Sequence, residues 1–292
     1  MSALIRLEAP AKINITLEVV RKLRNGYHAI RSVLVRLDDL SDTIEVRVTK
    51  GERGITLAST SKDIPTSESN TCYRAAAAYF AAIGEPAGAH IHIKKNIPIA
   101  AGLGGGSSDA AAVLLALNTH FNGRLAPRKL ETLSATIGKD VPFFLGGGKA
   151  CFVSGTGEIL RPIPAFPRSH FLIVNSGVAV STTDAYQAIA GSAWFMSHGD
   201  RTNISATMVA AIRARDTAKI AATLFNDFET CIEQLHPIVK EIKQALLAFG
   251  ARGALMTGSG PTVFGLFASK SALVRAEKNL RKHYTGLIIA ST

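Results

Sequence analysis

The chain has 292 residues, of which 47% are hydrophobic and 19% are charged, and its formal net charge is +11. This length allows one large domain or two of ordinary size, and the composition is typical of a globular enzyme with a sizeable core. No apolar run in the sequence reaches the length of a membrane-spanning helix, so we expect no membrane partner. The first residues alternate apolar and charged side chains, which predicts a strand rather than a signal peptide.

The net charge and the cysteine spacing indicate which partners and which redox environment to expect. A charge of +11 is compatible with a nucleic-acid surface or with a surface that attracts a small polyanion. The basic residues are dispersed and the sequence has no RNA-binding motif, so we expect no nucleic-acid partner. The three cysteines are widely separated and lack metal-type spacing, which indicates a reducing, cytoplasmic environment.

The first part of the chain is predicted to be rich in strands. Apolar and polar residues alternate in several short runs that are separated by turn residues. The predicted strands are Leu4–Glu8, Ile13–Val20, His28–Leu37, Thr43–Val48 and Ile55–Ala58. The predicted turns between them are Asn25-Gly26, Asp38–Asp42 and Lys50–Gly54.

A helix, a strand and a second helix are predicted next. The first helix covers Asn70–Ile83 and ends at Gly84, because glycine commonly stops a helix. A strand over His90–Lys94 leads into the segment Ile97–Asp109, which we call the glycine-rich stretch. The apolar run Ala110–Phe121 predicts the second helix.

The glycine-rich stretch predicts a phosphate-binding loop. Four glycines fall within five positions, whereas a connecting turn needs only one or two. Glycine lets the backbone approach an anion closely, and the first N–H groups of the following helix are unpaired. The stretch lacks the lysine that ends the P-loop of nucleotide hydrolases, and Ser107 stands where the dinucleotide fingerprint has its third glycine. The pattern therefore predicts a phosphate-binding loop that belongs neither to the P-loop proteins nor to the dinucleotide-binding proteins.

The next segment leads to a predicted domain boundary. Pro127 opens a helix over Arg128–Ile137, and an irregular stretch from residue 140 to residue 148 follows. Ala150–Val153 and Glu158–Pro162 form a predicted hairpin. Two prolines in Ile163–Pro167 interrupt the pattern, so we expect an N-terminal domain over residues 1–163 and a C-terminal domain over residues 164–292.

The C-terminal part predicts a different architecture. Its expected strands are His170–Asn175, Gly253–Met256, Val263–Phe267 and Gly286–Ala290. Its expected helices are Thr183–Ala190, Asn203–Arg215, Thr217–Phe225, Ile238–Phe249 and Ser271–His283. The order strand, helices, strand, strand, helix, strand is typical of a split βαβ, ferredoxin-like layer.

Three other segments contain candidate functional side chains. Lys12 and Asn14 lie at a strand start just after a proline. Tyr27 and His28 follow a tight turn, and Asp140 precedes a Val-Pro pair. Taken singly, each has an ordinary explanation, because a strand lysine is usually solvated and such an aspartate usually caps a helix or a turn.

Together with the glycine-rich stretch, these segments resemble a known family. Three motifs, Pro10–Asn14, Pro98–Ser108 and Thr257–Gly260, occur in the family's order. They resemble those of the small-molecule kinases typified by galactokinase, homoserine kinase, mevalonate kinase and phosphomevalonate kinase, the GHMP kinases. Gly26–His28 and Gly138–Pro142 are similar to the branch whose substrate carries a cytidine diphosphate group.

The resemblance implies a fold and a reaction. The fold would be α+β, with an N-terminal domain like ribosomal protein S5 domain 2 and a C-terminal ferredoxin-like domain. The reaction would transfer the γ-phosphoryl group of ATP to the 2-hydroxyl of 4-diphosphocytidyl-2-C-methyl-D-erythritol, a step of the non-mevalonate isoprenoid route. Asp140 would be the general base and Lys12 its electrostatic partner.

The resemblance also implies the binding residues. ATP would be bound by Asn70, Lys95, Pro98, Ala100, Ala101, Gly102, Leu103, Gly104, Gly105, Gly106, Ser107, Ser108 and Asp109. Mg²⁺ is expected with ATP, and Ser108 is a candidate ligand for it. The cytidine-bearing substrate would be bound by Asn14, Tyr27, His28, Thr182 and Tyr186.

Two alternatives remain open at this point. One is another GHMP kinase that acts on mevalonate, homoserine or a sugar, although the Gly26–His28 segment disfavours it. The other is a basic nucleic-acid-binding protein built on the S5-like domain, which leaves Lys12, Asp140 and the glycine-rich stretch unexplained. We expect a monomer or a weak homodimer.

Overall fold

The computed structural model describes residues 4–50, 54–146, 148–190 and 203–292. Its contacts divide the chain into two compact units, each built from several segments. The first unit comprises Met1–Ala11, Leu40–Ile99 and Gly104–Gly148, and the second comprises Lys12–Asp39, Ala100–Leu103 and Lys149–Thr292. Because the units interleave along the chain, they do not follow a single linear boundary, and the predicted division at residues 163 and 164 stays a prediction.

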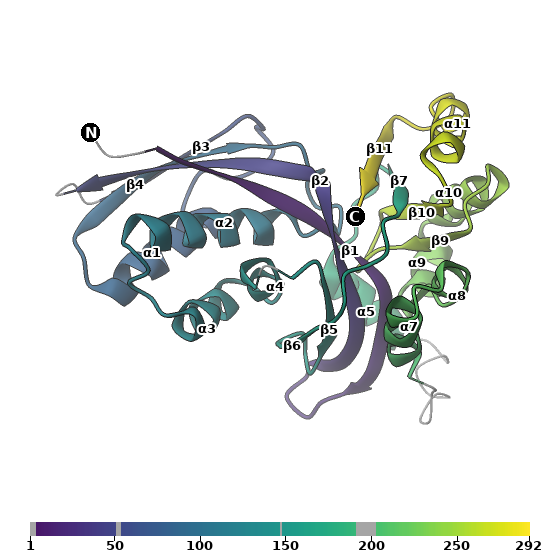
Figure 1. Cartoon of the computed structure of the whole chain (residues 1–292), viewed down its shortest axis with the longest axis horizontal. Coiled ribbons are helices and arrows are strands. Elements are labelled where there is room, and N and C mark those ends of the chain that lie inside the picture. The colour runs from purple at the N-terminus through teal and green to yellow at the C-terminus, as the bar shows by residue number, and fades with distance from the viewer. Residues whose placement is uncertain (1–3, 51–53, 147, 191–202) are drawn as a thin grey trace. The chain divides into compact units, whose positions relative to one another are not determined.

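Two long strands contribute to both units. Strand β1 covers Leu4–Lys22 and strand β2 covers His28–Lys50 (Figure 1). Each was predicted as two shorter strands, and the predicted turn at Asp38–Asp42 is wrong, because β2 continues through it. The acidic side chains that suggested a turn have partners instead. Asp38 pairs with Arg36 at 2.7 Å, and Asp42 is fully buried among hydrogen-bond donors.

Seven strands of the described residues form one sheet. Its main path is β3-β4-β2-β1-β8, and β5 pairs with β2 and with β6. The shorter strands are β3 (Gly54–Ser59), β4 (Ala87–Lys94), β5 (Ala150–Ser154), β6 (Ile159–Pro162) and β8 (Phe225–Asn226). The predicted hairpin is confirmed as β5 and β6. Of the predicted turn Lys50–Gly54, residues 51–53 lie outside the described residues.

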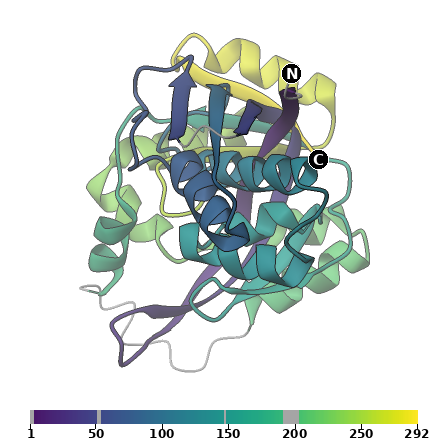
Figure 2. The same cartoon turned by 90° about the vertical axis from the view of Figure 1, so that its left-hand side faces the viewer.

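Helices cover one face of the strands of the first unit. Helix α1 (Thr71–Ile83) and helix α2 (Gly105–His120) pack against each other below β2, β3 and β4 (Figures 1 and 2). The prediction for α1 is confirmed: the Asn70 side chain accepts from the Cys72 N–H at 2.8 Å, and Gly84 ends the helix in the left-handed conformation. These two caps define both ends of α1.

The start of α2 differs from its prediction by five residues. The helix begins at Gly105 rather than at Ala110, so Gly105 to Ser108 form its first turn. Gly104 precedes the helix with a φ of 73°, a value that glycine adopts readily. The last glycines of the stretch are therefore helical and only the preceding ones form a loop.

Two more helices complete the first unit. Helix α3 covers Pro127–Ile137 and ends before Gly138, as predicted. The short helix α4 covers Val141–Leu145 within a stretch predicted to be irregular, because Pro142 fits the first turn of a helix. Gly147, in the same predicted stretch, lies outside the described residues.

The second unit contains an antiparallel sheet of four strands among the residues described. Its order is β11-β7-β10-β9, and the strands are β7 (His170–Asn175), β9 (Gly253–Met256), β10 (Val263–Phe267) and β11 (Gly286–Ser291). This order, with helices in the β7–β9 and β10–β11 connections, confirms the predicted ferredoxin-like layer.

Helices α7 (Ile204–Arg213) and α8 (Thr217–Ala222) of the second unit pack against each other, and α8 contacts β9. Helices α5 (Thr182–Ala190), α9 (Glu229–Leu235), α10 (Pro237–Ala248) and α11 (Lys270–Leu280) share a buried core with this sheet. The core joins Leu172 and Val174 of β7 to Ile242 and Leu246 of α10. Fully buried side chains of this size each contribute roughly 1.5–3 kcal/mol to the free energy of unfolding.

Two predictions in this unit are wrong. The helix predicted over Thr217–Phe225 ends at Ala222, because Phe225 and Asn226 form β8 and pair with β1. Helix α9 was not predicted. No helix in the described part of the chain is both long and apolar enough to cross a membrane.

Candidate active site

The three motifs of the sequence meet in the second unit. Lys12 and Asn14 come from β1, Gly102 from the glycine-rich stretch and Thr257 from the end of β9. The buried Lys12 amine donates to Asn14 Oδ1 at 2.7 Å and to the Gly102 carbonyl at 2.9 Å. The Asn14 N–H donates to Thr257 Oγ1 at 2.9 Å. Segments up to 243 residues apart in sequence therefore form one connected polar group.

Gly102 is required by the close approach of two of these motifs. A Cβ atom at this position would lie 3.0 Å from the Thr257 carbonyl oxygen, and the φ of Gly102 is 71°. On the facing loop, a Cβ atom at Gly258 would lie 3.4 Å from the Gly102 carbonyl oxygen and 3.6 Å from Asn14 Oδ1. A side chain at Gly102 would therefore force one of the two backbone segments to shift, and the positive φ of Gly102 is one that glycine adopts readily.

In the first unit, the first turn of α2 is held from two sides. Thr71, the first residue of α1, donates from Oγ1 to the Gly106 carbonyl at 2.8 Å. On the other side, a Cβ atom at Gly105 would lie 3.2 Å from Lys95 Nζ and 3.4 Å from Asp42 Oδ2. The N-terminus of α2, where helices bind anions, is thereby fixed in place.

Lys95 belongs to a buried cluster of charges. Its amine pairs with Asp42 Oδ2 and, at 3.0 Å, with Asp109 Oδ2. The Lys95 side chain is 8% exposed, and those of Asp42 and Asp109 are 0% and 3% exposed. We call Asp42, Lys95 and Asp109 the ion cluster.

The ion cluster has one positive and two negative side chains. Burial raises the pKa of the Asp109 carboxyl to about 7, with Lys95 opposing the rise and the Asp42 carboxylate adding to it. The pKa of Lys95 is also raised: burial alone would lower it, but the two carboxylates outweigh that effect. The two carboxylates compete for one lysine, so their balance of charge depends on pH.

Asp140 belongs to a segment of the first unit that comes close to the first turn of α2. It directly precedes α4, whose first residue is Val141. Close to it in sequence, a Cβ atom at Gly138 would lie 3.8 Å from Ser107 Oγ in the first turn of α2. Helices α2 and α4 also pack together. The structure therefore brings the segment that contains Gly138 close to the first turn of α2.

The aromatic residues assigned to the substrate lie together in the second unit. The rings of His28 and Tyr186 stack with centroids 4.8 Å apart and planes at 16°. Phe228 packs edge-on against Tyr186 at 4.9 Å. Burial, and to a smaller extent Lys22, lower the pKa of His28, which favours its neutral form. Tyr27 is 56% exposed, so its ring is accessible to a ligand.

Thr182, also assigned to the substrate, lies beside the third motif. It begins helix α5, and its hydroxyl is 3.2 Å from the hydroxyl of Ser259 in the Thr257–Gly260 loop. Within the second unit, residues assigned to the substrate are thus connected to the motif that also contacts Asn14 and Gly102.

The first turn of α2 contains oxygen atoms suited to a metal ion. Ser108 Oγ and Asp109 Oδ1 are buried and have no hydrogen-bond partner among the described residues. No cluster of three or more histidine, cysteine or acidic side chains in the described ranges is arranged to hold a metal. This donor set fits Mg²⁺, which binds one or two protein oxygens and takes its other ligands from phosphates and water.

Sequence reasoning missed several residues that support the site. Asp42 was placed in a turn, and Ser32, which accepts from Asn14 Nδ2 at 2.8 Å, was assigned no role. Asn226 was placed just beyond a predicted helix, yet its amide donates to the Met256 and Gly258 carbonyls at 2.7 and 2.8 Å. Asp42 and Asn226 lie in stretches of strand that were not predicted, whereas Ser32 lies in a predicted strand whose sequence gives no sign of its buried partner.

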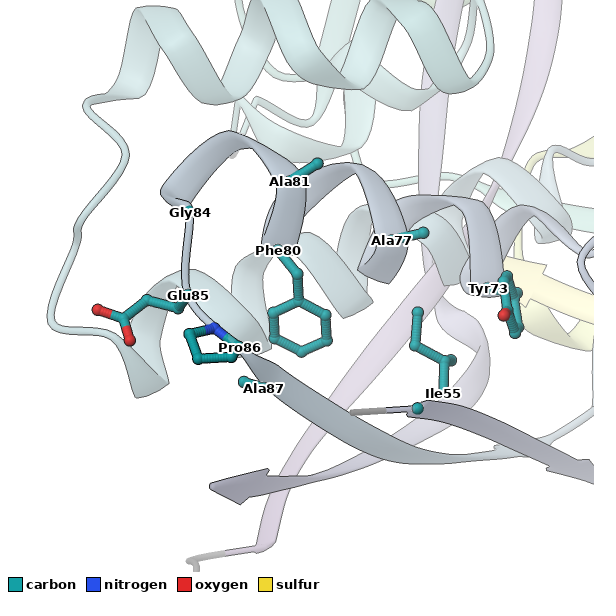
Figure 3. A pocket seen from close by; sticks show the side chains of 10 residues that line it. Ile55, Tyr73, Ala77, Phe80, Ala81, Gly84, Glu85, Pro86 and Ala87 are labelled. Carbon is teal, nitrogen blue, oxygen red and sulfur yellow. The ribbon is translucent and has the colours of Figure 1, made fainter. Parts of the chain in front are cut away.

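The described surface also has an open hollow of about 410 Å³ that lies apart from these residues. Figure 3 shows it between α1 and strands β3 and β4, with the Phe80 ring at its centre. The residues that line it are Gly54, Ile55, Tyr73, Ala77, Phe80, Ala81, Gly84, Glu85, Pro86 and Ala87. None of these is a predicted site residue.

Comparisons with known proteins identify the family of this chain. Residues 70–148 match the model of the GHMP kinases N terminal domain, and residues 208–286 match that of the GHMP kinases C terminal domain. The chain is 40% identical to a 4-diphosphocytidyl-2-C-methyl-D-erythritol kinase from Geobacter metallireducens, over 98% of this chain and 97% of that protein. It is 39% identical to the enzyme of the same name from Geobacter sulfurreducens, over 95% of each chain.

A solved structure is similar over the same extent. The crystal structure of a 4-(cytidine 5'-diphospho)-2C-methyl-D-erythritol kinase is 32% identical and covers 98% of each chain, with a TM-score of 0.82. The N-terminal S5-like fold and the C-terminal ferredoxin-like fold implied by the motifs are confirmed by these matches. The chain belongs to the GHMP kinase family, in the branch formed by the 4-diphosphocytidyl-2-C-methyl-D-erythritol kinases.

Proposed function

We propose that this chain transfers the γ-phosphoryl group of ATP to the 2-hydroxyl of 4-diphosphocytidyl-2-C-methyl-D-erythritol. The convergence of Lys12, Gly102 and Thr257 in one polar group carries the proposal, because it joins all three kinase motifs. The relatives described above are named as kinases of this substrate, which supports the proposal. In the transfer, the substrate oxygen forms a bond to the γ-phosphorus, the bond from that phosphorus to the β-γ bridging oxygen breaks, and ADP leaves.

Asp140 is the proposed general base. An alcohol is a poor nucleophile at neutral pH, so a carboxylate that accepts its proton during the transfer lowers the barrier. Lys12 is the proposed electrostatic partner, because its buried amine provides positive charge beside the Gly102 carbonyl. The proton of the 2-hydroxyl passes to the Asp140 carboxylate.

The glycine-rich stretch is the proposed site of the ATP phosphates. The backbone N–H groups at the start of α2 point to the helix terminus, where they stabilise negative charge. Asn70 supports this end by capping α1, and Ser108 is the proposed protein ligand of Mg²⁺. When bound, Mg²⁺ neutralises charge on the phosphates during transfer.

The aromatic cluster is the proposed site of the cytosine base. Tyr27 offers an exposed face for stacking, and the neutral His28 ring offers a hydrogen bond to the base. Tyr186 supports His28 by stacking on it. Thr182 and Asn14 are the proposed contacts to the rest of the substrate.

A phosphorylation assay tests the proposal. The wild-type chain is incubated with ATP, Mg²⁺ and the diphosphocytidyl substrate, with mevalonate, homoserine and galactose as competing acceptors. We expect turnover of the cytidyl substrate alone, and a faster reaction with another acceptor would overturn the assignment. Asp140→Asn should lower kcat by about 10²–10⁴. Asp63→Asn, at an exposed aspartate of the first unit, is the matched control and should leave kcat unchanged.

A further inference from the structure

We propose that Asp42 is a positioning residue that sets the glycine-rich stretch for ATP through Lys95, and this inference rests on the proposed kinase function. Asp42 lies on β2 and is fully buried. It has no place in the three family motifs, and sequence reasoning put it in a turn. Its two carboxylate oxygens act on two different parts of the nucleotide-binding segment.

The first oxygen holds the chain that enters the glycine-rich stretch. Asp42 Oδ1 accepts from the Asn96 N–H at 2.6 Å and from the Ile97 N–H at 2.9 Å. The Asn96 side chain donates to the Ser41 carbonyl at 2.9 Å, which adds a second connection to the same part of β2. These hydrogen bonds fix Asn96 and Ile97, which lie between β4 and the first glycine of the stretch, Gly102.

The second oxygen is connected to helix α2 through Lys95. Asp42 Oδ2 pairs with the Lys95 amine, which also pairs with Asp109 Oδ2 at 3.0 Å in α2. Asp42 thus holds both ends of the segment between Asn96 and Asp109. Because the phosphates would bind within this segment, a shift at either end moves the N–H groups that would contact them.

Packing shows that the amine has little freedom to move. The position that a Gly105 Cβ atom would take lies 3.2 Å from Lys95 Nζ, 3.2 Å from Ile97 Cγ2 and 3.4 Å from Asp42 Oδ2. Gly105 therefore rests directly on the ion cluster. This contact assigns the Lys95 amine to the support of the helix terminus, acting through Asp109.

The Asp42→Asn variant of the full chain separates the charge of Asp42 from its shape. The amide oxygen still accepts from Asn96 and Ile97, but the variant loses the negative charge that pairs with Lys95. Loss of one charge-assisted hydrogen bond corresponds to about a tenfold change in an equilibrium constant. We expect the KM for ATP and the Kd for ADP to rise about tenfold, with kcat at saturating ATP and the KM for the cytidyl substrate changed less than about threefold.

Two further measurements distinguish positioning from general destabilisation. Leu117→Ala, at a buried leucine near the other end of α2, is the matched control. It should lower the free energy of unfolding but leave the Kd for ADP unchanged. Hydrogen exchange of residues 102–112, relative to that of the rest of α2, should be faster in Asp42→Asn and unchanged in Leu117→Ala. An unchanged Kd for ADP in a folded Asp42→Asn variant, or an equal rise in both variants, would overturn the proposal.

A second variant covers the case in which Asp42→Asn does not fold. Lys95→Arg keeps the charge but brings a larger group against Gly105, so it should displace the start of α2 and raise the Kd for ADP about fivefold or more. No change in that Kd would overturn the positioning role. Failure of the kinase proposal is seen separately: the wild-type chain would bind ADP without phosphorylating the cytidyl substrate, and ADP binding would still report on Asp42.

Discussion

Each unit has a buried polar network beneath a part of the candidate site, and the two networks are built differently. In the first unit, the ion cluster places two carboxylates around one lysine. In the second unit, alternate residues of β1 face one side of the strand, and we call Asn14, Thr16 and Glu18 the polar row. Apart from Asn14 Oδ1, which accepts from the Lys12 amine, the bonds of the polar row go to hydroxyls and backbone groups.

The difference indicates which property each part of the site depends on. The ion cluster holds its position only while its charges balance, because a buried charge without a partner is costly. The polar row holds its position by directional bonds. Thr16 Oγ1 lies 2.8 Å from Ser205 Oγ, and Glu18 accepts from the Ser205 N–H at 2.8 Å at the start of α7. We therefore expect the stability of the ion cluster to depend on pH and on charge-changing substitutions. We expect the stability of the polar row to depend on individual hydrogen bonds.

Removing the lysine of the ion cluster should have the largest effect on stability. Lys95→Met leaves the Asp42 and Asp109 carboxylates buried without a counter-ion, which should lower the free energy of unfolding by about 3–5 kcal/mol. Urea denaturation at pH 8 measures this loss. Lys62→Met, at an exposed lysine of the same unit, should change stability by less than about 0.5 kcal/mol. Equal losses in the two variants would mean that the cluster does not depend on its charge balance.

The ion cluster also marks the limit of what the sequence predicted. Strands and helices with regular patterns were found, including strands β9 (Gly253–Met256) and β10 (Val263–Phe267) of the ferredoxin-like layer with their bounds. Asp42 was missed because acidic residues in a strand look like a turn until their buried partners are known. Those partners, Lys95 and Asp109, are far from Asp42 in sequence, and only the fold brings them together.

The candidate site divides in the same way. Lys12, Gly102 and Thr257 were found because family motifs mark them, and the structure joins them. The early start of α2 was missed because glycines usually end helices. Here a Cβ atom at Gly105 would lie only 3.2 Å from Lys95 Nζ, so a larger residue at the start of the helix would press against the ion cluster. The contact between Gly105 and Lys95 outweighs the low helix propensity of glycine, and a single sequence does not reveal contacts between distant residues.

The ion cluster and the polar row should also differ in how their contributions to stability depend on pH. The pKa of Asp109 is about 7 in the folded chain and near its ordinary value of 3.8 when unfolded. Between these values the folded state binds more protons, so the stabilising contribution of Asp109 is complete below about pH 4 and is lost as the pH rises to 7. The slope is at most about 1.4 kcal/mol per pH unit for one proton.

Paired variants isolate this contribution from that of other titrating groups. Free energies of unfolding are measured by urea denaturation from pH 5 to pH 8 without nucleotide or Mg²⁺. The difference between the wild type and Asp109→Asn should change with pH, whereas the difference between the wild type and Thr16→Val should stay constant. A constant difference for Asp109→Asn would show that its carboxyl group does not titrate in this range.

The smallest expected effect tests whether the polar row acts as a network. Thr16→Val keeps the shape of the side chain but removes the hydroxyl that accepts from the Val33 N–H at 3.0 Å and meets Ser205 at 2.8 Å. The loss should be about 1 kcal/mol, the usual value of a neutral hydrogen bond. A double-mutant cycle with Ser205→Ala measures the coupling by urea denaturation. A coupling of 0.5 kcal/mol or more would show that β1 and α7 are joined through this pair. Strictly additive losses would mean that each hydroxyl depends on its backbone partners, and the contrast with the ion cluster would then rest on charge alone.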